Sequence, residues 1–443
     1  MEATNIWDRR NNLSPACIFL PQSADEVAES VALLQKHSAQ FAIRGGGHMN
    51  RPGSNNINDG VLLALNHLNH IRVTDGEQSV EVGPGNTWAD VYNALGAYGR
   101  YAIGGRLKAI GVPGLTLIGG FHYFINKYGF AMDNVLSYDV VLGNGTQVIA
   151  NATSNADLFW ALKGGANNFG IVTNFVLKTF DAPQFSTTTQ VFDEAAIPDF
   201  IRAVCDLTKH DDPTVGAGAV ITITKNATTK EVSASLLGVQ EGVESPPTRF
   251  ANFSSIPAVT RQHAVMAPKQ WHSRVDSPFQ MFRIQFGHHS VKPDHHAVLE
   301  LYDRWRQAVD DISDVEGLYP TFVLNMVPRT AATVAKTNGI GNTWGLDDVD
   351  SYIWWQLSTA WDRREDDMRV SSWSQSLLER LHAINRGKGL ASEFLYIGDS
   401  AEYQNPYSTF PPESIAKLRE VRAKYDVGRV FTKLNWGGFK LGY

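Results

Sequence analysis

The sequence predicts an α+β fold in two lobes, and three observations carry that prediction. The chain has 443 residues, more than one hydrophobic core usually supports, so more than one lobe is expected. Glycine clusters are frequent up to about residue 180 and rare after it. Helical and strand-like segments occur on both sides of that change, without repeats or low-complexity tracts. We therefore expect one lobe over 1–180, completed by 405–443, and a second over 181–404.

The first lobe begins with a strand, a helix and a second strand. "LSPACIFLPQ" predicts the first strand, and "SADEVAESVALLQKHS" predicts the helix, with Ser23 as N-cap and Glu26 three residues later. "AQFAIRGGGH" then predicts a short buried strand that runs into Gly45, Gly46, Gly47 and His48.

Further elements of this lobe follow from periodicity and turn residues. "VLLAL", "HIRVT" and "SVEVGPG" predict short strands, and "SNADLFWALKGG" predicts a helix before a glycine turn and a strand. "TWADVYNALGAYG" predicts a helix whose buried face holds Trp88, Val91, Tyr92 and Leu95. Asn144-Gly145 between two apolar runs predicts a hairpin.

The second lobe alternates strands with longer helices. Strands are expected at "AVITITKN", "KEVSASLLGVQ" and "SYIWWQLSTAW", and helices at "DHHAVLELYDRWRQAVDDI" and "SWSQSLLERLHAINRG". The tail predicts an amphipathic helix at "ESIAKLREVRAKYD" and a short strand at "RVFT".

Composition excludes several classes of protein. Hydrophobic residues make up 43% and charged residues 19%, which is typical of globular proteins and not of disordered chains. The net charge is −6 and no basic stripe exists, so nucleic acid is not an expected partner. No apolar run approaches the ~18 residues of a membrane span.

The cellular compartment stays open between two alternatives. Cys17 and Cys205 neither require nor exclude a disulfide. The N-terminus lacks the pattern of a signal peptide, so the protein is either intracellular or begins here after a removed signal. A mild excess of N-x-S/T sequons, at Asn12, Asn144, Asn151, Asn226 and Asn252, leads us to expect a glycoprotein of the secretory pathway. We also expect a monomer.

Glycine loops are the main functional signal. Consecutive backbone N–H groups can form a concavity for anions such as a diphosphate, although a tight structural turn is the alternative. Several clusters in one lobe favour a cradle for a long phosphate-bearing cofactor. Neither the dinucleotide-binding G-x-G-x-x-G pattern with its acidic residue nor a P-loop is present. The clusters after Gly45–Gly47 lie at Gly111, Gly114, Gly119, Gly120, Gly164, Gly165 and Gly170.

A collinear set of motifs resembles a known family. The set is "RGGGH", "VEVGPGNTWADVY", "GVPGLTLIGG", "YGFAMDNVLSYDVVLGNG" and "DLFWALKGGANNFGIVT". It resembles the berberine bridge enzyme-like flavoproteins of the vanillyl-alcohol oxidase superfamily, whose FAD domain is of the p-cresol methylhydroxylase type. "NGIGNTWGL", "QNPYSTF" and "KYDVGRVF" look like the fungal branch. The resemblance implies an FAD-binding α+β domain and a substrate domain whose antiparallel sheet is covered by helices.

The resemblance implies that FAD is held covalently. His48 matches the histidine that bonds to the 8α-methyl group of the flavin ring, which explains why the glycine run ends there. The second flavin link in many relatives comes from a cysteine, but Leu107 stands at that position, so no thioether is expected. The implied FAD contacts are Arg44, Gly45, Gly46, Gly47, His48, Met49, Ser54, Ile110, Gly111, Gly114, Gly119, Gly120, Gly170, Ile171, Val172 and Asn405.

Two positions matter for the chemistry that the resemblance implies. Ile110 matches the position that gates oxygen, where valine goes with oxidases and leucine with dehydrogenases, so isoleucine favours neither. The family's Y-x-N-Y strand supplies a tyrosine base, and here Tyr396 matches the first tyrosine while Asp399 stands at the base position. Asp399 is either the base or a solvated residue at a strand end, with Tyr396 and Tyr403 as substitutes. As a strand, this stretch would put Tyr396 and Asp399 on opposite faces unless Gly398 allows a bulge.

The histidine pairs and the clustered tryptophans are weaker functional signals. The histidine pairs at 288–289 and 295–296 are interrupted by Pro293 and lack a supporting ligand pattern, so no metal is expected. Trp354, Trp355 and Trp361 lie on an expected strand, where most belong in a core and one could stack on a substrate ring.

These features predict an FAD-dependent oxidoreductase. It would oxidise a small organic molecule, a secondary-metabolite intermediate rather than a sugar, with O2 as acceptor and hydrogen peroxide as product. The alternatives are a flavin-containing cyclase without net redox turnover and a flavin-binding protein without turnover.

Overall fold

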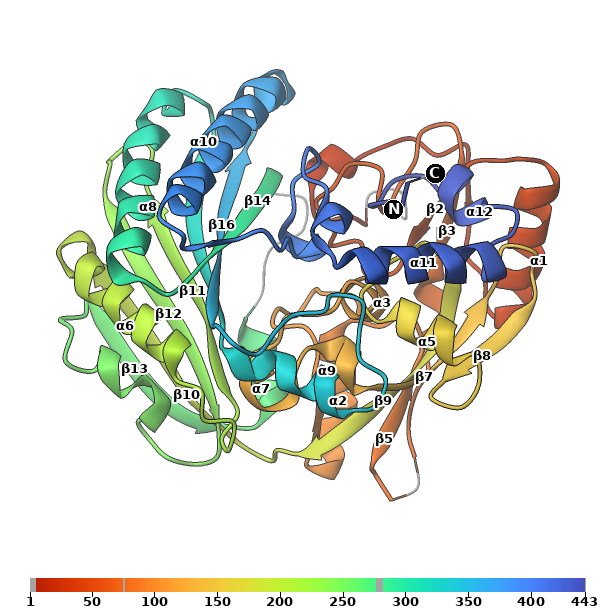
Figure 1. Ribbon diagram of the computed structural model, residues 1–443, viewed down its shortest axis with the longest axis horizontal. Coiled ribbons are helices and arrows are strands. Elements are labelled where there is room, and N and C mark those ends of the chain that lie inside the picture. The colour runs from red at the N-terminus through yellow and green to blue at the C-terminus, as the bar shows by residue number, and fades with distance from the viewer. Residues whose placement is uncertain (1–4, 75, 276–281, 443) are drawn as a thin grey trace.

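The computed structural model describes residues 5–74, 76–275 and 282–442. It is a mixed helix and sheet structure with a three-stranded, a six-stranded and an eight-stranded sheet (Figure 1). The predicted α+β class is therefore confirmed.

The three-stranded sheet is parallel and carries the glycine run at one strand end. Its order is β1 (Cys17–Phe19), β3 (Val61–Ala64) and β2 (Phe41–Arg44), and helix α1 (Ala24–Lys36) connects β1 to β2. The Ser23 side chain accepts a hydrogen bond from the Glu26 backbone N–H at 3.2 Å, which confirms the predicted N-cap.

The six-stranded sheet contains the predicted hairpin. Gly145 has a φ of 81° in the turn, a conformation that glycine adopts at little cost. The strands are β4 (Ile71–Val73), β5 (Ser79–Val82), β9 (Ile171–Asp181), β7 (Val135–Val141) and β8 (Gln147–Asn151), with β6 (Arg100–Ala102) paired to β9.

Short helices accompany this sheet. Helix α2 (Trp88–Leu95) buries the four residues expected on its inner face, Trp88, Val91, Tyr92 and Leu95. The others are α3 (Val112–Leu117), α4 (Ile125–Tyr128) and α5 (Ala156–Leu162).

The eight-stranded sheet is antiparallel throughout, and helices cover one of its faces (Figure 1). The order is β13 (Thr260–Met266), β10 (Phe185–Asp193), β12 (Val232–Glu241), β11 (Ala217–Lys225), β15 (Tyr319–Val327), β16 (Tyr352–Trp361), β14 (Arg283–Val291) and β17 (Ala391–Ser392). The covering helices are α6 (Ile197–Lys209), α8 (His295–Ala308) and α10 (Asp367–Gly387), and two shorter helices are α7 (Pro268–Arg274) and α9 (Thr333–Thr337).

Strand alternation gives the two faces of this sheet different roles. Trp355 and Trp361 pack into the core beneath the helices, whereas Trp354 belongs to the core on the opposite face. Asn325 lies between Leu324 and Met326, two members of the helix-covered core, so its side chain is on the same face as Trp354. This face carries no covering helix, and we call it the open face; it packs in part against residues of the first lobe such as Phe130 and holds the candidate site.

The C-terminal tail returns to the three-stranded sheet. After α11 (Pro412–Tyr425), the Phe41 N–H donates to the Leu434 carbonyl at 2.9 Å, and Phe41 forms an isolated bridge with Asn435. The strand predicted at "RVFT" is wrong, because Val430–Lys433 forms helix α12. The Asp426 carboxylate accepts from the backbone N–H groups of Val430 at 2.8 Å and Phe431 at 3.0 Å, which satisfies the start of a helix.

The predicted strand around Asp399 is also wrong. Residues Ile397–Asp399 form a 3₁₀ turn, with the Asp399 N–H donating to the Tyr396 carbonyl at 3.2 Å. The turn brings the two side chains near each other, since the Asp399 carboxylate contributes to raising the pKa of Tyr396. A Cβ at Gly398 would lie 2.5 Å from the Tyr396 ring, which explains the glycine there.

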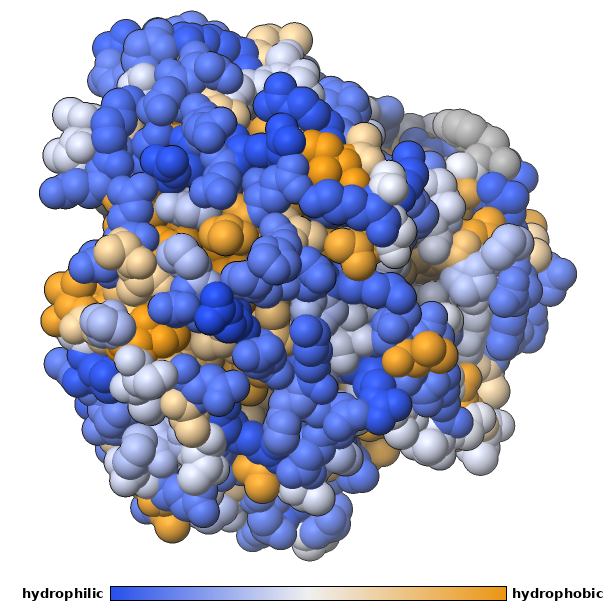
Figure 2. Space-filling model, turned by 60° about the vertical axis from the view of Figure 1, so that its left-hand side comes forward, coloured by the Kyte–Doolittle hydropathy of each residue, from blue (hydrophilic) through white to orange (hydrophobic). Residues whose placement is uncertain are grey.

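The surface is mainly hydrophilic on the face that Figure 2 shows, with hydrophobic residues scattered over it. Within the described residues, no helix combines the length and apolar composition that a membrane span needs.

Asp426→Ala should lower the free energy of unfolding by about 1–3 kcal/mol, because two buried N–H groups of α12 lose their acceptor. Denaturant titration measures this, with Asp426→Asn as the control that keeps one acceptor oxygen. Equal losses in both variants would contradict the capping role.

Candidate active site

Two glycine loops meet by direct backbone contact. A Cβ on Gly46 would lie 2.5 Å from the Gly111 Cα, and one on Gly45 would lie 2.4 Å from the Pro113 side chain. Gly47 has a φ of 70°, in the left-handed region that favours glycine. The loop ending in His48 is therefore packed against the loop that carries Leu107 and Ile110.

The second loop is fixed by backbone hydrogen bonds at the start of α2. The Trp88 N–H donates to the Ile110 carbonyl at 2.8 Å, and the Val112 N–H donates to the Asn86 carbonyl at 3.0 Å. Leu107 and Ile110 are half-buried on this loop. Their positions are thus set by α2 and not by loop flexibility.

His48 is held by an aromatic stack. Its ring lies 4.2 Å from the Trp7 ring with an interplanar angle of 12°, and the Trp7 N–H donates to the Gly47 carbonyl at 2.9 Å. Trp7 also contacts Phe286 of β14, with 5.7 Å between the ring centroids. His48 therefore lies where the glycine loop approaches the eight-stranded sheet.

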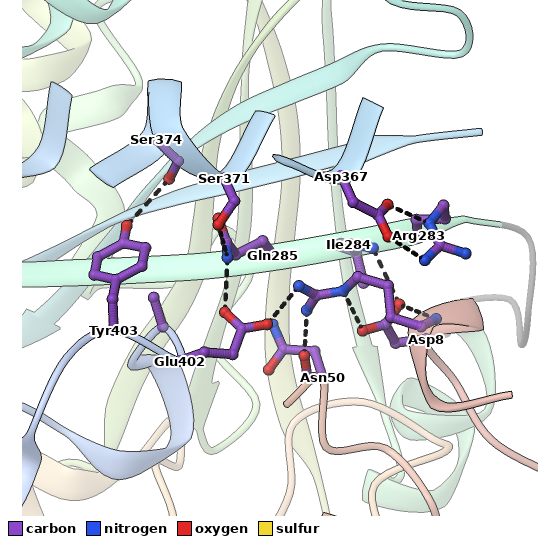
Figure 3. A network of polar contacts seen from close by, with 12 residues as sticks. Asp8, Asn50, Arg283, Ile284, Gln285, Asp367, Ser371, Ser374, Glu402 and Tyr403 are labelled. Atoms are coloured by element: carbon purple, nitrogen blue, oxygen red, sulfur yellow. Dashed lines mark hydrogen bonds and ion pairs between the residues drawn. The ribbon is translucent and has the colours of Figure 1, made fainter. Parts of the chain in front are cut away.

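A polar network fastens the same region to the sheet (Figure 3). Arg10 donates to Asp8 at 2.9 Å, to Glu402 at 2.5 Å and to the Asn50 carbonyl. Glu402 also accepts from Gln285 of β14 at 2.7 Å. The segment before β1, the loop after His48 and the chain near residue 400 are thus joined by one set of contacts.

Asp8 is the buried centre of this network. Its carboxylate accepts from the Arg10 backbone at 2.9 Å and from the Ile284 backbone at 3.2 Å. Burial raises the pKa of Asp8 to about 6, although Arg10 acts in the opposite direction.

The loop after His48 faces the C-terminal tail with unsatisfied polar groups. Arg51 Nη1, Ser54 Oγ and Asn55 Oδ1 are buried without a hydrogen-bond partner among the described residues. The Arg51 guanidinium lies 4.0 Å from the centroid of the Phe439 ring. Buried polar atoms are normally paired, so these three are available to a polar ligand.

A second cation lies close to Arg51. Lys440 Nζ donates to Asn435 Oδ1 at 2.9 Å, and burial lowers the pKa of this amine to about 7, with Arg51 adding to the effect. Neither cation makes an ion pair within the described part of the chain. The Arg51 guanidinium, a buried amine that an adjacent anion would keep protonated, and a glycine cradle fit the doubly charged diphosphate of FAD.

The remaining predicted FAD contacts fall into two groups. Arg44 and Met49 flank the first loop, Gly114 is exposed in α3, and Ser54 lies in the loop that follows His48. The others lie at positions where neighbouring protein atoms or the local backbone structure restrict the residue. Gly119 and Gly120 pack against Trp344 and Ala131, Gly170 against Val140, Ile171 and Val172 begin β9, and Asn405 precedes a 3₁₀ turn.

Asp399 is the acidic group on the open sheet face. Its Oδ2 accepts from Asn325 Nδ2 at 3.0 Å, and its side chain keeps some accessible surface. Burial raises the pKa of Asp399 to about 6, while Arg106 and the Asn325 hydrogen bond lower it. A carboxylate of that pKa is ionised at neutral pH and still basic enough to take a proton.

Arg106 is a functional candidate that sequence reasoning missed. Its guanidinium donates to Asn325 Oδ1 at 3.0 Å and to the Ala219 carbonyl at 3.2 Å, and it lies 4.5 Å from the centroid of the Phe121 ring. The available signal was an arginine between Gly105 and Leu107, next to the position of the absent cysteine.

The two candidate tyrosines, Tyr396 and Tyr403, lie in different parts of the structure. Tyr396 stacks on Trp354, with 5.4 Å between centroids, and burial together with the nearby Asp399 raises its pKa. Tyr403 instead places its hydroxyl 3.4 Å from Ser374 Oγ of α10, in the helix-covered core. Tyr396 therefore accompanies Asp399, and Tyr403 does not.

The histidine pairs have structural contacts. His288 Nε2 accepts from the Tyr396 backbone N–H at 2.7 Å, and so supports the turn that carries Asp399. His289 stacks on His382 of α10 at 3.6 Å, and His295 and His296 begin α8. Over the described ranges, no group of three or more possible metal ligands is present.

Known proteins resemble this chain in sequence and in fold. The FAD binding domain family matches residues 15–151. An FAD-dependent monooxygenase of Penicillium roqueforti is 32% identical over 98% of this chain and 88% of its own length. A bifunctional solanapyrone synthase of Alternaria solani is 30% identical over 97% of this chain and 82% of its own.

Solved structures show the same fold at low identity. A 6-hydroxy-D-nicotine oxidase of Arthrobacter nicotinovorans aligns with a TM-score of 0.79 at 19% identity, covering 99% of this chain and 95% of that one. A Physcomitrella patens BBE-like protein aligns with a TM-score of 0.78 at 18% identity, covering 100% and 95%.

Gly114→Ala should lower the FAD content of the purified protein if the cofactor occupies the space beside α3. No atom lies within 4 Å of the position of its missing Cβ, so the chain itself tolerates alanine. The ratio of flavin to protein absorbance measures the effect. Gly387→Ala is the matched control, since this glycine in α10 also has no neighbour within 4 Å. Unchanged FAD content in Gly114→Ala would argue against contact there.

Proposed function

Since the chain belongs to the berberine bridge enzyme-like FAD-linked oxidoreductases, we propose that it oxidises a small organic molecule with FAD attached covalently through His48. The observation that carries this proposal is Asp399, a half-buried carboxylate that accepts from Asn325 of β15 at 3.0 Å and has a pKa of about 6. A group of this kind can take the proton that an alcohol or similar substrate loses on two-electron oxidation.

The residues that would hold FAD come from three parts of the chain. His48 would provide the tether, and its stack on Trp7 fixes the ring orientation before attachment. Arg51 and Lys440 would balance the diphosphate charge. When bound, FAD supplies a two-electron acceptor that O2 can reoxidise with formation of hydrogen peroxide.

A single tether is part of the proposal. Leu107 lies on the loop that packs against the His48 loop, where a relative's cysteine would form the second bond. A leucine side chain cannot form a thioether. Ile110, on the same loop, would border the oxygen path, and its size does not by itself decide between oxidase and dehydrogenase.

Asp399 would act as the base in this reaction. Asn325 orients its carboxylate by donating to Oδ2 at 3.0 Å, which leaves Oδ1 for the substrate. Tyr396 would line the same space and fix it through its stack on Trp354. Three side chains thus define where the reacting group must lie.

The substrate we propose is a secondary-metabolite intermediate. Similarity to a fungal bifunctional solanapyrone synthase supports this over a sugar. An aspartate in place of the family's tyrosine favours a cyclase without net redox change as the second candidate. Product mass separates them, because oxidation removes two hydrogens and cyclisation removes none.

A secretory location is also proposed. Four of the five sequon asparagines are exposed, namely Asn12, Asn144, Asn226 and Asn252, as N-glycosylation requires.

His48→Ala should abolish covalent attachment of FAD. Acid-precipitated wild-type protein is expected to stay yellow, whereas the variant releases its colour into the supernatant. Digestion of wild type should give one flavin-linked peptide containing His48 and none spanning Gly105–Gly111. Release of all FAD from acid-treated wild type would disprove the tether, and a cross-linked double peptide would disprove the single attachment.

Asp399→Asn should slow flavin reduction by substrate by roughly 10²–10⁴-fold with FAD still bound, because the base is lost and the shape is kept. The ionised carboxylate is the active form. The wild-type rate should therefore fall as pH drops below about 6 and level off above it, while the variant shows no such step. Stopped-flow absorbance measures both, and an unchanged rate in the variant would move the role to Tyr396 or favour the cyclase.

A further inference from the structure

Arg106 is a cation whose nearest contacts are all neutral. It donates to the Ala219 carbonyl and to the Asn325 amide oxygen, and it stacks over Phe121. It makes no ion pair with any residue that the structure describes. Asn325 stands between the guanidinium and the Asp399 carboxylate, because its Oδ1 binds one and its Nδ2 binds the other.

Within the described ranges of the chain, the surroundings do not offer Arg106 a second anion. Burial raises the pKa of Tyr123 to about 12 and also raises that of Tyr396, so both hydroxyls stay protonated. Among the residues that the structure describes, the nearby acid is Asp399, which is linked through the Asn325 amide and not by direct contact. A half-buried guanidinium without a direct counter-ion loses part of its hydration, and an anionic ligand would offset that loss.

Both charged groups remain reachable by a ligand. Arg106 and Asp399 each keep part of their surface accessible, although protein surrounds them. The Phe121 ring covers one face of the guanidinium, which leaves its edge for in-plane hydrogen bonds.

We propose that Arg106 binds an acidic oxygen of the substrate, which places the substrate among carboxylic acids, phenols or enols. This inference rests on the proposed function, since it names the substrate class of the same site. An oxyanion beside Arg106 would complete the charge balance at the moment when Asp399 takes up a proton and loses its own charge. Asn325 would keep the cation and the base at a fixed separation, so that one substrate can contact both.

The geometry also predicts competition between the two anions. An ionised Asp399 partly neutralises Arg106 through the low-dielectric interior and repels a second negative charge. Removing the Asp399 charge should therefore strengthen anion binding, and removing the Arg106 charge should weaken it.

Isothermal titration calorimetry on the purified full-length protein tests this without turnover. The probes are sodium benzoate and sodium formate, each paired with its neutral amide, benzamide and formamide. We expect wild type to prefer each anion over its amide, and Arg106→Met to lose about 10–100-fold in anion affinity with little change for the amides. Asp399→Asn should bind the anions more tightly than wild type. Arg106→Lys should retain the anion preference, and Lys108→Met, an exposed change on the same loop, should behave as wild type.

Equal affinity of wild type for anion and amide would overturn the inference even if Arg106→Met fails to fold. Unchanged anion affinity in a folded Arg106→Met would do the same. The proposed function is judged separately. Anion binding at Arg106 with normal flavin reduction in Asp399→Asn would refute the base and keep the anion site. Slow reduction in Asp399→Asn without anion preference would keep the base and refute the anion site.

Discussion

The candidate site depends on one backbone contact, the approach of Gly46 to Gly111. Their Cα atoms are so close that a single Cβ on either glycine would meet the other's backbone within 2.7 Å. One loop presents His48, and the other presents Leu107, Ile110 and the arginine that reaches Asn325. Any larger residue at the contact would separate the two loops, so the position of His48 relative to Arg106 is set by the absence of two side chains.

The second requirement is that the eight-stranded sheet keeps a fixed position relative to those loops. Trp7 and Arg10 meet this requirement at the His48 end, through a ring stack and a buried ion-pair network that includes β14. Arg106 meets it at the other end by bonding to β11 and β15. The open face of the eight-stranded sheet is therefore attached to the glycine loops at two separate points.

Sequence patterns predicted the structure correctly where interactions between residues close in sequence determine it. The Ser23 cap, the buried face of α2 and the Asn144-Gly145 hairpin follow from residues close in sequence, and all three are present. "RVFT" was misjudged since β-branched and aromatic residues favour strands, while the deciding contact is the buried Asp426 carboxylate on the N–H groups of α12.

The chemistry-bearing residues were predicted less well because distant contacts position them. Tyr396 and Asp399 come near each other through a 3₁₀ turn supported by His288, which lies more than a hundred residues earlier. No local sequence pattern predicts that turn, and the strand motif of the family predicted a strand there instead. Arg106 gains its role only when β15 brings Asn325 beside it. The sequence could name the candidate base, but not the arginine that accompanies it.

The pairing of Phe41 with Leu434 and Asn435 joins parts of the chain that are far apart in sequence, since Phe41 and Asn435 are separated by 394 positions. Arg51 likewise contacts Phe439 across a comparable separation. Contacts of such large sequence separation require the closure of a long loop, which costs conformational entropy before the contact stabilises the fold. The loop that carries His48 therefore gains these neighbours by global folding, and the glycine-rich segment around it cannot complete the cradle from local interactions alone.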